Sequence, residues 1–250
     1  MRIPMDIEGK VAFITGTRRI GRLVGLALGQ KGARVALGYH RSRESAEQAA
    51  RELRDAGRQA MPVQADLNRQ EEISDAVKRI AAVWGGVDVL VNLASVYASK
   101  PFEETTEHDW DLNMNVNLRS AFLCARAVIP GMKARGGGRI INCADWTAAS
   151  GRPRYKGYLP YYVSKVGVVG LTEALALELA PYNILVNAVA PGPMVPPPDL
   201  TPEAVEKVRQ VTPLGRWGGG EQIALAVIGL IDSDFITGEC IRVDGGRHIL

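Results

Sequence analysis

The sequence predicts an α/β fold in which a parallel β-sheet is covered by helices on both faces. Short runs of β-branched and other apolar residues alternate along the whole chain with longer segments of helical periodicity. Strands and helices in this alternation form parallel sheets through right-handed crossover connections. No fixed-period repeat interrupts the pattern, so we expect a single domain over residues 1–250 with about seven strands.

The expected strands are apolar runs bounded by turn residues, at 10–15, 34–39, 60–65, 87–92, 138–144, 184–190 and 240–246. Helical patterns begin at about Ile20, cover 43–57, 71–85, about 108–135 and 161–179, and occur twice more before the last strand. Prolines fill the stretch from Pro191 to Pro202. Proline cannot continue a helix or a sheet interior, so we expect a substrate loop at about 191–212, although a stiff connector is equally consistent.

Composition and charge argue against several classes of function. Of the 250 residues, 46% are hydrophobic and 23% are charged, and the net charge of +3 comes from basic residues scattered among acidic ones. This distribution argues against a nucleic-acid partner. The three cysteines, Cys124, Cys143 and Cys240, are far apart and lack metal-ligand spacing, so we expect a reducing compartment and no metal. No apolar run is long enough to span a membrane, and we expect a cytoplasmic protein with no membrane partner.

A glycine turn follows the first expected strand. The segment TGTRRIG places Gly16 at a tight turn and Gly21 near the start of a helix, whose free N–H groups can receive a pyrophosphate. Arg18 and Arg19 add positive charge beside it. The turn does not match GxGxxG, and an ordinary strand-to-helix turn with solvated arginines is an equally good interpretation of these residues alone.

The residues at the end of the second expected strand indicate whether the cofactor is NAD or NADP(H). His40, Arg41 and Ser42 lie where a cofactor ribose would bind, and no acidic residue is present there to bind a free 2′-hydroxyl. An arginine at this point favours a 2′-phosphate. We therefore expect NADP(H) rather than NAD, together with a small-molecule substrate.

Two further segments carry groups suited to proton transfer. Tyr161 and Lys165 are four residues apart in a helical pattern, so their side chains share one face. A phenol titrates at about 10, and an adjacent ammonium should lower that pKa toward neutrality, which suits proton exchange with a carbonyl oxygen. On its own, this spacing more often marks a surface pair. The apolar run IINCA is followed by Asp145. A carboxylate at the carboxyl edge of a sheet is expected either to have hydrogen-bond or ionic partners or to take part in the chemistry.

Motifs along essentially the whole chain resemble the short-chain dehydrogenase/reductase family. They are TGTRRIG (15–21), ADL (65–67), NLAS (92–95), NVNL (115–118), YYVSK (161–165), NAVAPG (187–192) and ITGECIRVDGG (236–246). The resemblance implies a Rossmann-type doubly wound sheet, an NADP(H)-dependent oxidoreductase, and a homotetramer paired through the helices at about 108–135 and 161–180. Two departures are a first turn one residue shorter than TGxxxGxG and Leu93 in place of a usual asparagine.

The resemblance also assigns roles to individual residues. Tyr161 and Lys165 become the catalytic pair, and Asn117 positions a water for proton relay through the lysine. Asp66 would hold the adenine and Asn92 would brace a strand end beside the cofactor. The complete set of implied cofactor contacts is Gly16, Arg18, Arg19, Ile20, Gly21, His40, Arg41, Ser42, Asp66, Leu67, Asn92, Ala94, Pro191 and Gly192.

The residue that follows IINCA distinguishes branches of this family. The family normally carries a serine there to hydrogen-bond the substrate carbonyl, whereas this chain has Asp145. Pteridine reductases resemble the chain in this aspartate, in the phrases RRIG, YHRS and VQADL, and in an aromatic residue, Tyr97, shortly after NLAS. In that branch the acid works with Tyr161 to protonate a ring nitrogen during C=N reduction, Tyr97 stacks on the pterin, and Arg19 and Ser95 are candidate pterin contacts.

We rank C=N reduction above ketone reduction, because an ionised Asp145 would repel a developing alkoxide, whereas an imine nitrogen gains a proton. The segment GRPRYKGYLP (151–160) makes the spacing from Asp145 to Tyr161 a few residues longer than usual and could reshape the pocket. Two alternatives stay open: a carbonyl reductase acting on 3-oxoacyl thioesters, and an NADP-binding regulator without chemistry. The presence of Tyr161, Lys165 and Asn117 together argues against the regulator.

Overall fold

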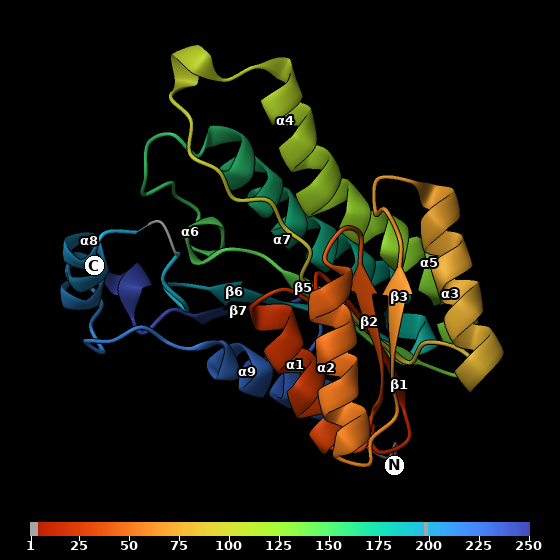
Figure 1. The fold of residues 1–250 in the computed structure, drawn as a ribbon. Helices are drawn as coiled ribbons and strands as arrows, with labels where there is room; N and C mark the ends of the chain where they lie inside the picture. Colours follow the sequence, from red (N-terminus) through yellow and green to blue (C-terminus); the bar gives the residue numbers. More distant parts are fainter. Residues whose placement is uncertain (1–4, 198–199) are drawn as a thin grey trace.

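A computed structural model describes residues 5–197 and 200–250 and contains a seven-stranded parallel sheet (Figure 1). The strand order is β3-β2-β1-β4-β5-β6-β7, and every neighbouring pair is parallel. The strands are β1 (Val11–Thr15), β2 (Arg34–Tyr39), β3 (Ala60–Gln64), β4 (Val89–Asn92), β5 (Gly138–Cys143), β6 (Ile184–Pro191) and β7 (Cys240–Val243). The predicted doubly wound sheet is confirmed, and its strand order reverses between β1 and β4, where ligands bind in such sheets.

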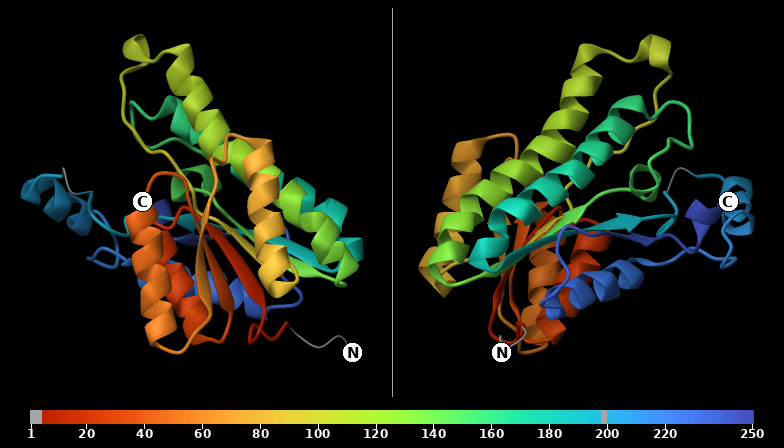
Figure 2. Two further views of the ribbon diagram at one scale, coloured as in Figure 1. Left: turned by 45° about the vertical axis from the view of Figure 1, so that its right-hand side comes forward. Right: turned by 180° about the vertical axis from the view of Figure 1, so that it is seen from behind.

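Helices cover both faces of the sheet (Figures 1 and 2). One face carries α1 (Ile20–Gln30), α2 (Arg43–Asp55) and α9 (Gly220–Asp232), and the other carries α3 (Gln70–Trp84), α4 (Glu107–Asn113), α5 (Ser120–Ala134) and α7 (Leu159–Leu179). Shorter helices are α6 (Trp146–Ala149), α8 (Pro202–Gln210), η1 (Phe102–Glu104), η3 (Ala180–Tyr182) and η4 (Arg247–Ile249).

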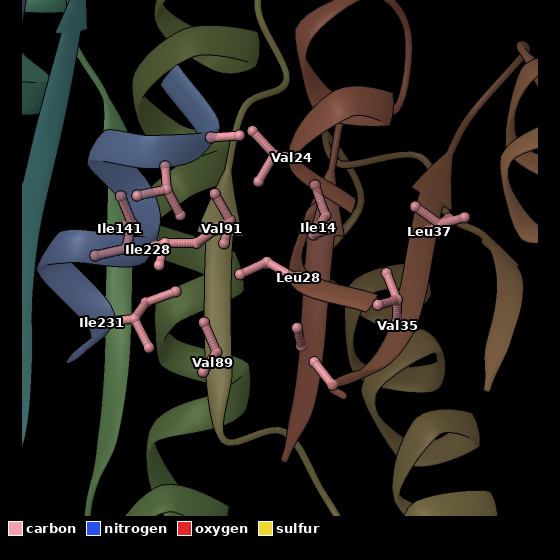
Figure 3. Close-up of a cluster of buried hydrophobic side chains, with 14 of the residues drawn as sticks. Ile14, Val24, Leu28, Val35, Leu37, Val89, Val91, Ile141, Ile228 and Ile231 are labelled. Carbon is pink, nitrogen blue, oxygen red and sulfur yellow. The ribbon is translucent and has the colours of Figure 1, made fainter. Parts of the chain in front are cut away.

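Side chains that alternate along each strand divide the core into two layers. Ile14 and Val91 pack with Leu28 of α1 and Ile228 of α9 (Figure 3), whereas Phe13 packs against the α3 and α5 layer. The period of two in a strand sends neighbouring side chains to opposite faces. Both faces are therefore buried, which accounts for strands that are apolar at nearly every position.

Two segments differ from their expected form. The helix expected at about 108–135 is α4 and α5 joined by a π-helical segment, η2 (Met114–Arg119). The substrate loop expected at about 191–212 contains the helix α8, because Thr201 caps its first turn and Pro202 occupies its first position. Residues 198 and 199 of that loop lie outside the described residues.

The carboxyl ends of β5, β6 and β7 lead to the same end of the molecule as α6, α8 and the C-terminus (Figures 1 and 2). Within residues 5–197 and 200–250, no helix combines the length and the apolar character needed to cross a bilayer.

Candidate active site

Asp145 is held at the end of β5 by the start of α6. It is the N-cap of that helix, and its Oδ1 accepts hydrogen bonds from the backbone N–H of Thr147 at 2.8 Å and from the Thr147 hydroxyl at 2.6 Å. Its Oδ2 accepts a hydrogen bond from the Tyr161 hydroxyl at 3.1 Å. One carboxylate oxygen is therefore fixed by the fold, and the other is aimed at the phenol.

Tyr161 and Lys165 lie on one face of α7, as their spacing predicts, but they do not hydrogen-bond to each other. The Lys165 ammonium is buried and donates to the Cys143 carbonyl at 2.8 Å, and it lies 5.7 Å from the centre of the Tyr161 ring. The end of β5 thus positions the lysine through its backbone and the tyrosine through Asp145.

The expectation that Lys165 lowers the pKa of Tyr161 toward neutrality is wrong for this arrangement. Burial raises the pKa of Tyr161 well above its ordinary value, and the nearby Asp145 carboxylate raises it further. The ammonium favours the phenolate but does not outweigh these two effects, because it bonds the Cys143 carbonyl instead of the phenol oxygen. Tyr161 in this structure is a neutral phenol at physiological pH.

Asn117 lies in the π-helical segment η2, close to Tyr161 and Lys165 of α7, and is buried. Its Oδ1 accepts from the Val96 N–H at 2.8 Å and the Ser95 hydroxyl at 3.1 Å, and its Nδ2 donates to the Ser164 hydroxyl at 3.0 Å. Ser164 in turn donates to the Tyr161 carbonyl at 2.7 Å. Asn117 therefore links the segment after β4 to α7, and its role in a water relay remains a prediction.

The glycine turn allows β1, α1 and the end of β4 to approach closely. Gly16 has a φ of 73°, and a Cβ there would lie 2.5 Å from the Ala94 nitrogen. A Cβ on Gly21 would lie 2.1 Å from the Gly16 carbonyl oxygen. Only glycine satisfies both positions, so the turn forms the backbone cradle expected ahead of α1 although it lacks the middle glycine of TGxxxGxG. Such a cradle fits the phosphates of a dinucleotide.

Arg19 has a backbone conformation that is rare for a residue with a side chain, with a φ of 53° and a ψ of −108°. Its Nη2 donates to the Val195 carbonyl at 2.7 Å. The side chain expected to contact cofactor or pterin therefore joins the glycine turn to the proline-rich loop, whereas Arg18 is exposed.

The residues expected around the ribose gather at the ends of β2 and β3. His40 and Arg41 are exposed, and His40 Nε2 lies 3.9 Å from Asp66 Oδ2. Among the residues that the structure describes, Arg41 forms no ion pair. Ser42 precedes α2 without a side-chain cap bond, and Leu67 packs against the core. The region therefore presents a free guanidinium to an incoming phosphate.

Asn92, at the end of β4, donates to the Asn142 Oδ1 at 3.0 Å. Its own Oδ1 is buried and has no hydrogen-bond partner within the described part of the chain. At the end of β6, a Cβ on Gly192 would lie 2.6 Å from the Asp244 Cα, so the turn after Pro191 is tightly packed. The bracing role of Asn92 and the position of this turn beside a nicotinamide remain predictions.

A cavity of about 530 Å³ connects the glycine turn with the Asp145–Tyr161 pair. Its wall contains these expected site residues: Arg18, Arg19, Ile20, Gly21, Ser95, Tyr97, Asp145, Tyr161, Lys165, Pro191 and Gly192. The other expected site residues do not line it: Gly16, His40, Arg41, Ser42, Asp66, Leu67, Asn92, Ala94 and Asn117. They lie at the carboxyl ends of β1, β2, β3 and β4, and in η2.

The sequence predicts only some of the aromatic residues that line the cavity. Tyr97 stacks on Tyr158, with ring centres 4.6 Å apart, and meets Tyr161 edge-on at 4.8 Å. One face of the expected stacking platform is therefore already covered. Tyr158, Tyr155 and Trp146 also line the cavity. Their signal in the sequence is the unusual segment 151–160 and the aromatic residue directly after Asp145.

Comparison with known proteins agrees with this geometry. A family model described as enoyl-(acyl carrier protein) reductase matches residues 15–248. A curated relative, 3-oxoacyl-(acyl-carrier-protein) reductase FabG of Staphylococcus epidermidis, is 35% identical over 245 residues, which cover 96% of this chain and 99% of the relative. The chain therefore belongs to the short-chain dehydrogenase/reductase family and is an oxidoreductase.

Two solved structures share the whole fold. A putative gluconate dehydrogenase from Agrobacterium tumefaciens superposes with a TM-score of 0.91 at 33% identity, covering 100% of both chains. A blue fluorescent protein from a metagenomic library, in complex with NADPH, gives a TM-score of 0.89 at 33% identity, covering 97% of this chain and 99% of that one. None of these proteins is named as a pteridine reductase, so they do not support the expected closeness to that branch.

Proposed function

We propose that the protein is an NADPH-dependent reductase of a small-molecule carbonyl compound. The observation that carries the proposal is the Tyr161 hydroxyl, which lines the cavity as a neutral phenol beside a buried ammonium. A neutral phenol can donate a proton to a carbonyl oxygen. The relative named as a 3-oxoacyl reductase supports ketone reduction over the pteridine function that the sequence favours.

The reduced nicotinamide, when bound, supplies the hydride that adds to the carbonyl carbon. Tyr161 holds the proton that the carbonyl oxygen acquires, so the product alcohol carries one hydride and one proton. The Lys165 ammonium, 5.7 Å from the ring centre, favours the phenolate that remains. Asn117 and Ser164 fix the backbone of α7 at this point.

NADP(H) is the proposed cofactor because its 2′-phosphate matches the charge at the end of β2. Arg41 is exposed there, and no acidic residue of the described ranges forms an ion pair with it. The backbone around Gly16 and Gly21 would hold the pyrophosphate, and Asp66 would face the adenine. The NADPH complex of a structural neighbour supports this choice.

Asp145 favours a second candidate, the reduction of a C=N bond. Its Oδ2 accepts from the Tyr161 hydroxyl at 3.1 Å, and a carboxyl–phenol pair can deliver a proton to a ring nitrogen. In a ketone reductase the same contact orients the phenol, and Tyr161 exchanges it for the substrate oxygen.

The test is loss of NADPH absorbance with purified protein, offered an acetoacetyl thioester, a free 3-oxo acid and dihydrobiopterin in parallel, with NADH as the cofactor control. Turnover of either ketone with NADPH supports the proposal. Turnover of the pterin alone establishes the second candidate. Faster turnover with NADH than with NADPH contradicts the assigned role of Arg41.

A further inference from the structure

Two arginines lie beside Trp146 in the wall of the cavity that contains Tyr161. The Arg154 guanidinium carbon is 5.7 Å from the Trp146 ring centre, and that of Arg247 is also 5.7 Å away. Arg154 comes from the extra segment between Asp145 and Tyr161, and Arg247 comes from η4 near the C-terminus. Two guanidinium groups from segments far apart in the sequence therefore lie in one part of the pocket.

Neither guanidinium is neutralised by the protein. Arg154 donates to the His248 carbonyl at 3.2 Å, and its Nε is buried with no hydrogen-bond partner within residues 5–197 and 200–250. Arg247 donates to the Val208 carbonyl at 3.1 Å and the Thr212 hydroxyl at 3.3 Å, and it also interacts with the uncharged Tyr155 hydroxyl. Within the same residues neither arginine forms an ion pair with a carboxylate.

Two carboxylates of the described residues adjoin the arginines, Asp145 in the cavity wall and Asp244 three residues before Arg247, and both already accept hydrogen bonds. Asp145 accepts from Thr147 and Tyr161. Asp244 accepts from the His248 backbone N–H at 2.9 Å and lies 2.8 Å from the His248 ring nitrogen. A guanidinium has five N–H donors, and leaving donors unpaired in a partly buried site is costly. The unpaired donors of Arg154 and Arg247 thus favour an anionic ligand.

The arginines are close to the reaction centre along the wall. Trp146 directly follows Asp145 in sequence, and its ring is 6.1 Å from that of Tyr155. Tyr158 lies 6.4 Å from Tyr155 and 6.4 Å from Tyr161. One small molecule can therefore span the distance, since the cavity of about 530 Å³ is typical in volume for such a ligand.

We propose that Arg154 and Arg247 bind an anionic group, a carboxylate or a phosphate monoester, on a small oxo compound whose carbonyl faces Tyr161. Guanidinium groups match both anions through paired N–H donors. This inference rests on the proposed carbonyl reduction and narrows its substrate class. It favours a free oxo acid or oxo phosphate over a thioester, whose reacting end carries no charge.

The test compares charged and neutral forms of one ketone on the same protein. The pairs are acetoacetate with ethyl acetoacetate, and dihydroxyacetone phosphate with dihydroxyacetone, so the two arms separate a carboxylate from a phosphate. We expect at least one anion to exceed its neutral partner tenfold or more in kcat/KM. Arg154→Met and Arg247→Met should each reduce that ratio about tenfold, and Arg247→Lys should retain part of it.

Arg152→Met is the matched control, because Arg152 is exposed, near in sequence and absent from the cavity wall; it should leave the ratio unchanged. The ratio compares the kcat/KM values of two substrates on the same protein sample. Partial unfolding of a variant lowers both values equally and leaves the ratio unchanged. Equal turnover of charged and neutral forms by the natural protein, or an unchanged ratio in both methionine variants, overturns the inference.

A protein that reduces none of these ketones contradicts the proposed function without deciding the anion site. Thermal shifts with glutarate and with glycerol 3-phosphate then decide it. Stabilisation of the natural protein that is lost in Arg247→Met supports the site. No stabilisation, or equal stabilisation of both proteins, overturns it.

Discussion

Among single residues, Asp145 has the strongest effect on what Tyr161 can do. The carboxylate occupies the position where the family usually has a serine, and it contacts the phenol directly at 3.1 Å. A serine hydroxyl could donate to a substrate oxygen, whereas an ionised carboxylate only accepts. The substitution therefore keeps the phenol protonated and makes Tyr161 the only donor of the pair when Asp145 is ionised.

Replacing Asp145 with asparagine should lower the pKa of Tyr161. The negative charge disfavours the phenolate, so its removal lets the phenol ionise at a lower pH, while burial still holds the pKa above its usual value. Ultraviolet titration of the cofactor-free protein measures this, and subtracting the spectrum of the matching Tyr161→Phe protein isolates Tyr161 from the other tyrosines. An unchanged or higher pKa in Asp145→Asn would show that the carboxylate does not act on the phenol.

Arg41→Ala should reduce the preference for NADPH. Loss of one charge-assisted contact to the 2′-phosphate is expected to raise the KM for NADPH about tenfold, while the KM for NADH changes little. Arg43→Ala is the matched control, since Arg43 is exposed at the start of α2 and pairs with Glu47 at 3.4 Å. Steady-state kinetics with both cofactors makes the comparison, and equal effects of the two substitutions would contradict the assignment of Arg41.

Among the elements, the π-helical segment between α4 and α5 has the clearest consequence for the site. It turns Asn117 toward the segment after β4 and toward α7, where the amide meets Val96 and Ser164. π-segments often occur at functional sites. Here the π-helical turn places the buried Asn117 amide so that it hydrogen-bonds both the segment after β4 and α7.

Asn117→Ala should cost both stability and activity. The substitution leaves the Val96 N–H without its 2.8 Å partner, at a cost of about 1–3 kcal/mol. A chain of this size should then melt several degrees lower, with kcat reduced as well. Asn115→Ala is the control in the same segment, because none of the described side-chain hydrogen bonds involves Asn115. Differential scanning calorimetry and kcat measure the two effects; equal melting temperatures for both variants would contradict the structural role.

The strands, the glycine turn and the Tyr161–Lys165 face could be predicted because they depend on local periodicity and on residue types with narrow conformational choices. The bond from Lys165 to the Cys143 carbonyl could not, because it depends on how α7 crosses the end of β5. The contact of Arg154 with the His248 carbonyl joins residues that are distant in sequence. The π-segment has no signature in hydrophobic periodicity, since a helical pattern continues through it.

Across the whole molecule, the sheet separates the α1 and α2 layer from an outer layer of helices on its other face. The glycine turn and the ribose end lie with α1 and α2, whereas α4, α5 and α7 form an outer layer on the opposite face (Figure 2). That layer exposes large apolar side chains, among them Phe122 of α5 and Val166 of α7. Exposed apolar surface of this kind is typical of a protein interface.

The homotetramer that the family resemblance implies remains a prediction, and this exposed layer is the surface through which we expect it to pair. Light scattering after size-exclusion chromatography should give the mass of four chains, and Phe122→Asp combined with Val166→Asp should lower it. Arg51→Asp is the control, because that side chain is polar, exposed and located on α2, on the other face. A monomer mass for the natural protein, or an unchanged mass for the double variant, would contradict the expected assembly.

Tyr161 is proposed to supply the proton that accompanies hydride transfer in this cavity. The most direct measurement is the single-turnover rate of NADPH oxidation, with a ketone that the natural protein reduces, for that protein and for Tyr161→Phe, alongside the Kd for NADPH of each. A general acid contributes roughly 10²–10⁴ in rate, so the variant should be at least about a hundredfold slower with the Kd unchanged. A Tyr161→Phe protein that oxidises NADPH at the natural rate would contradict the account.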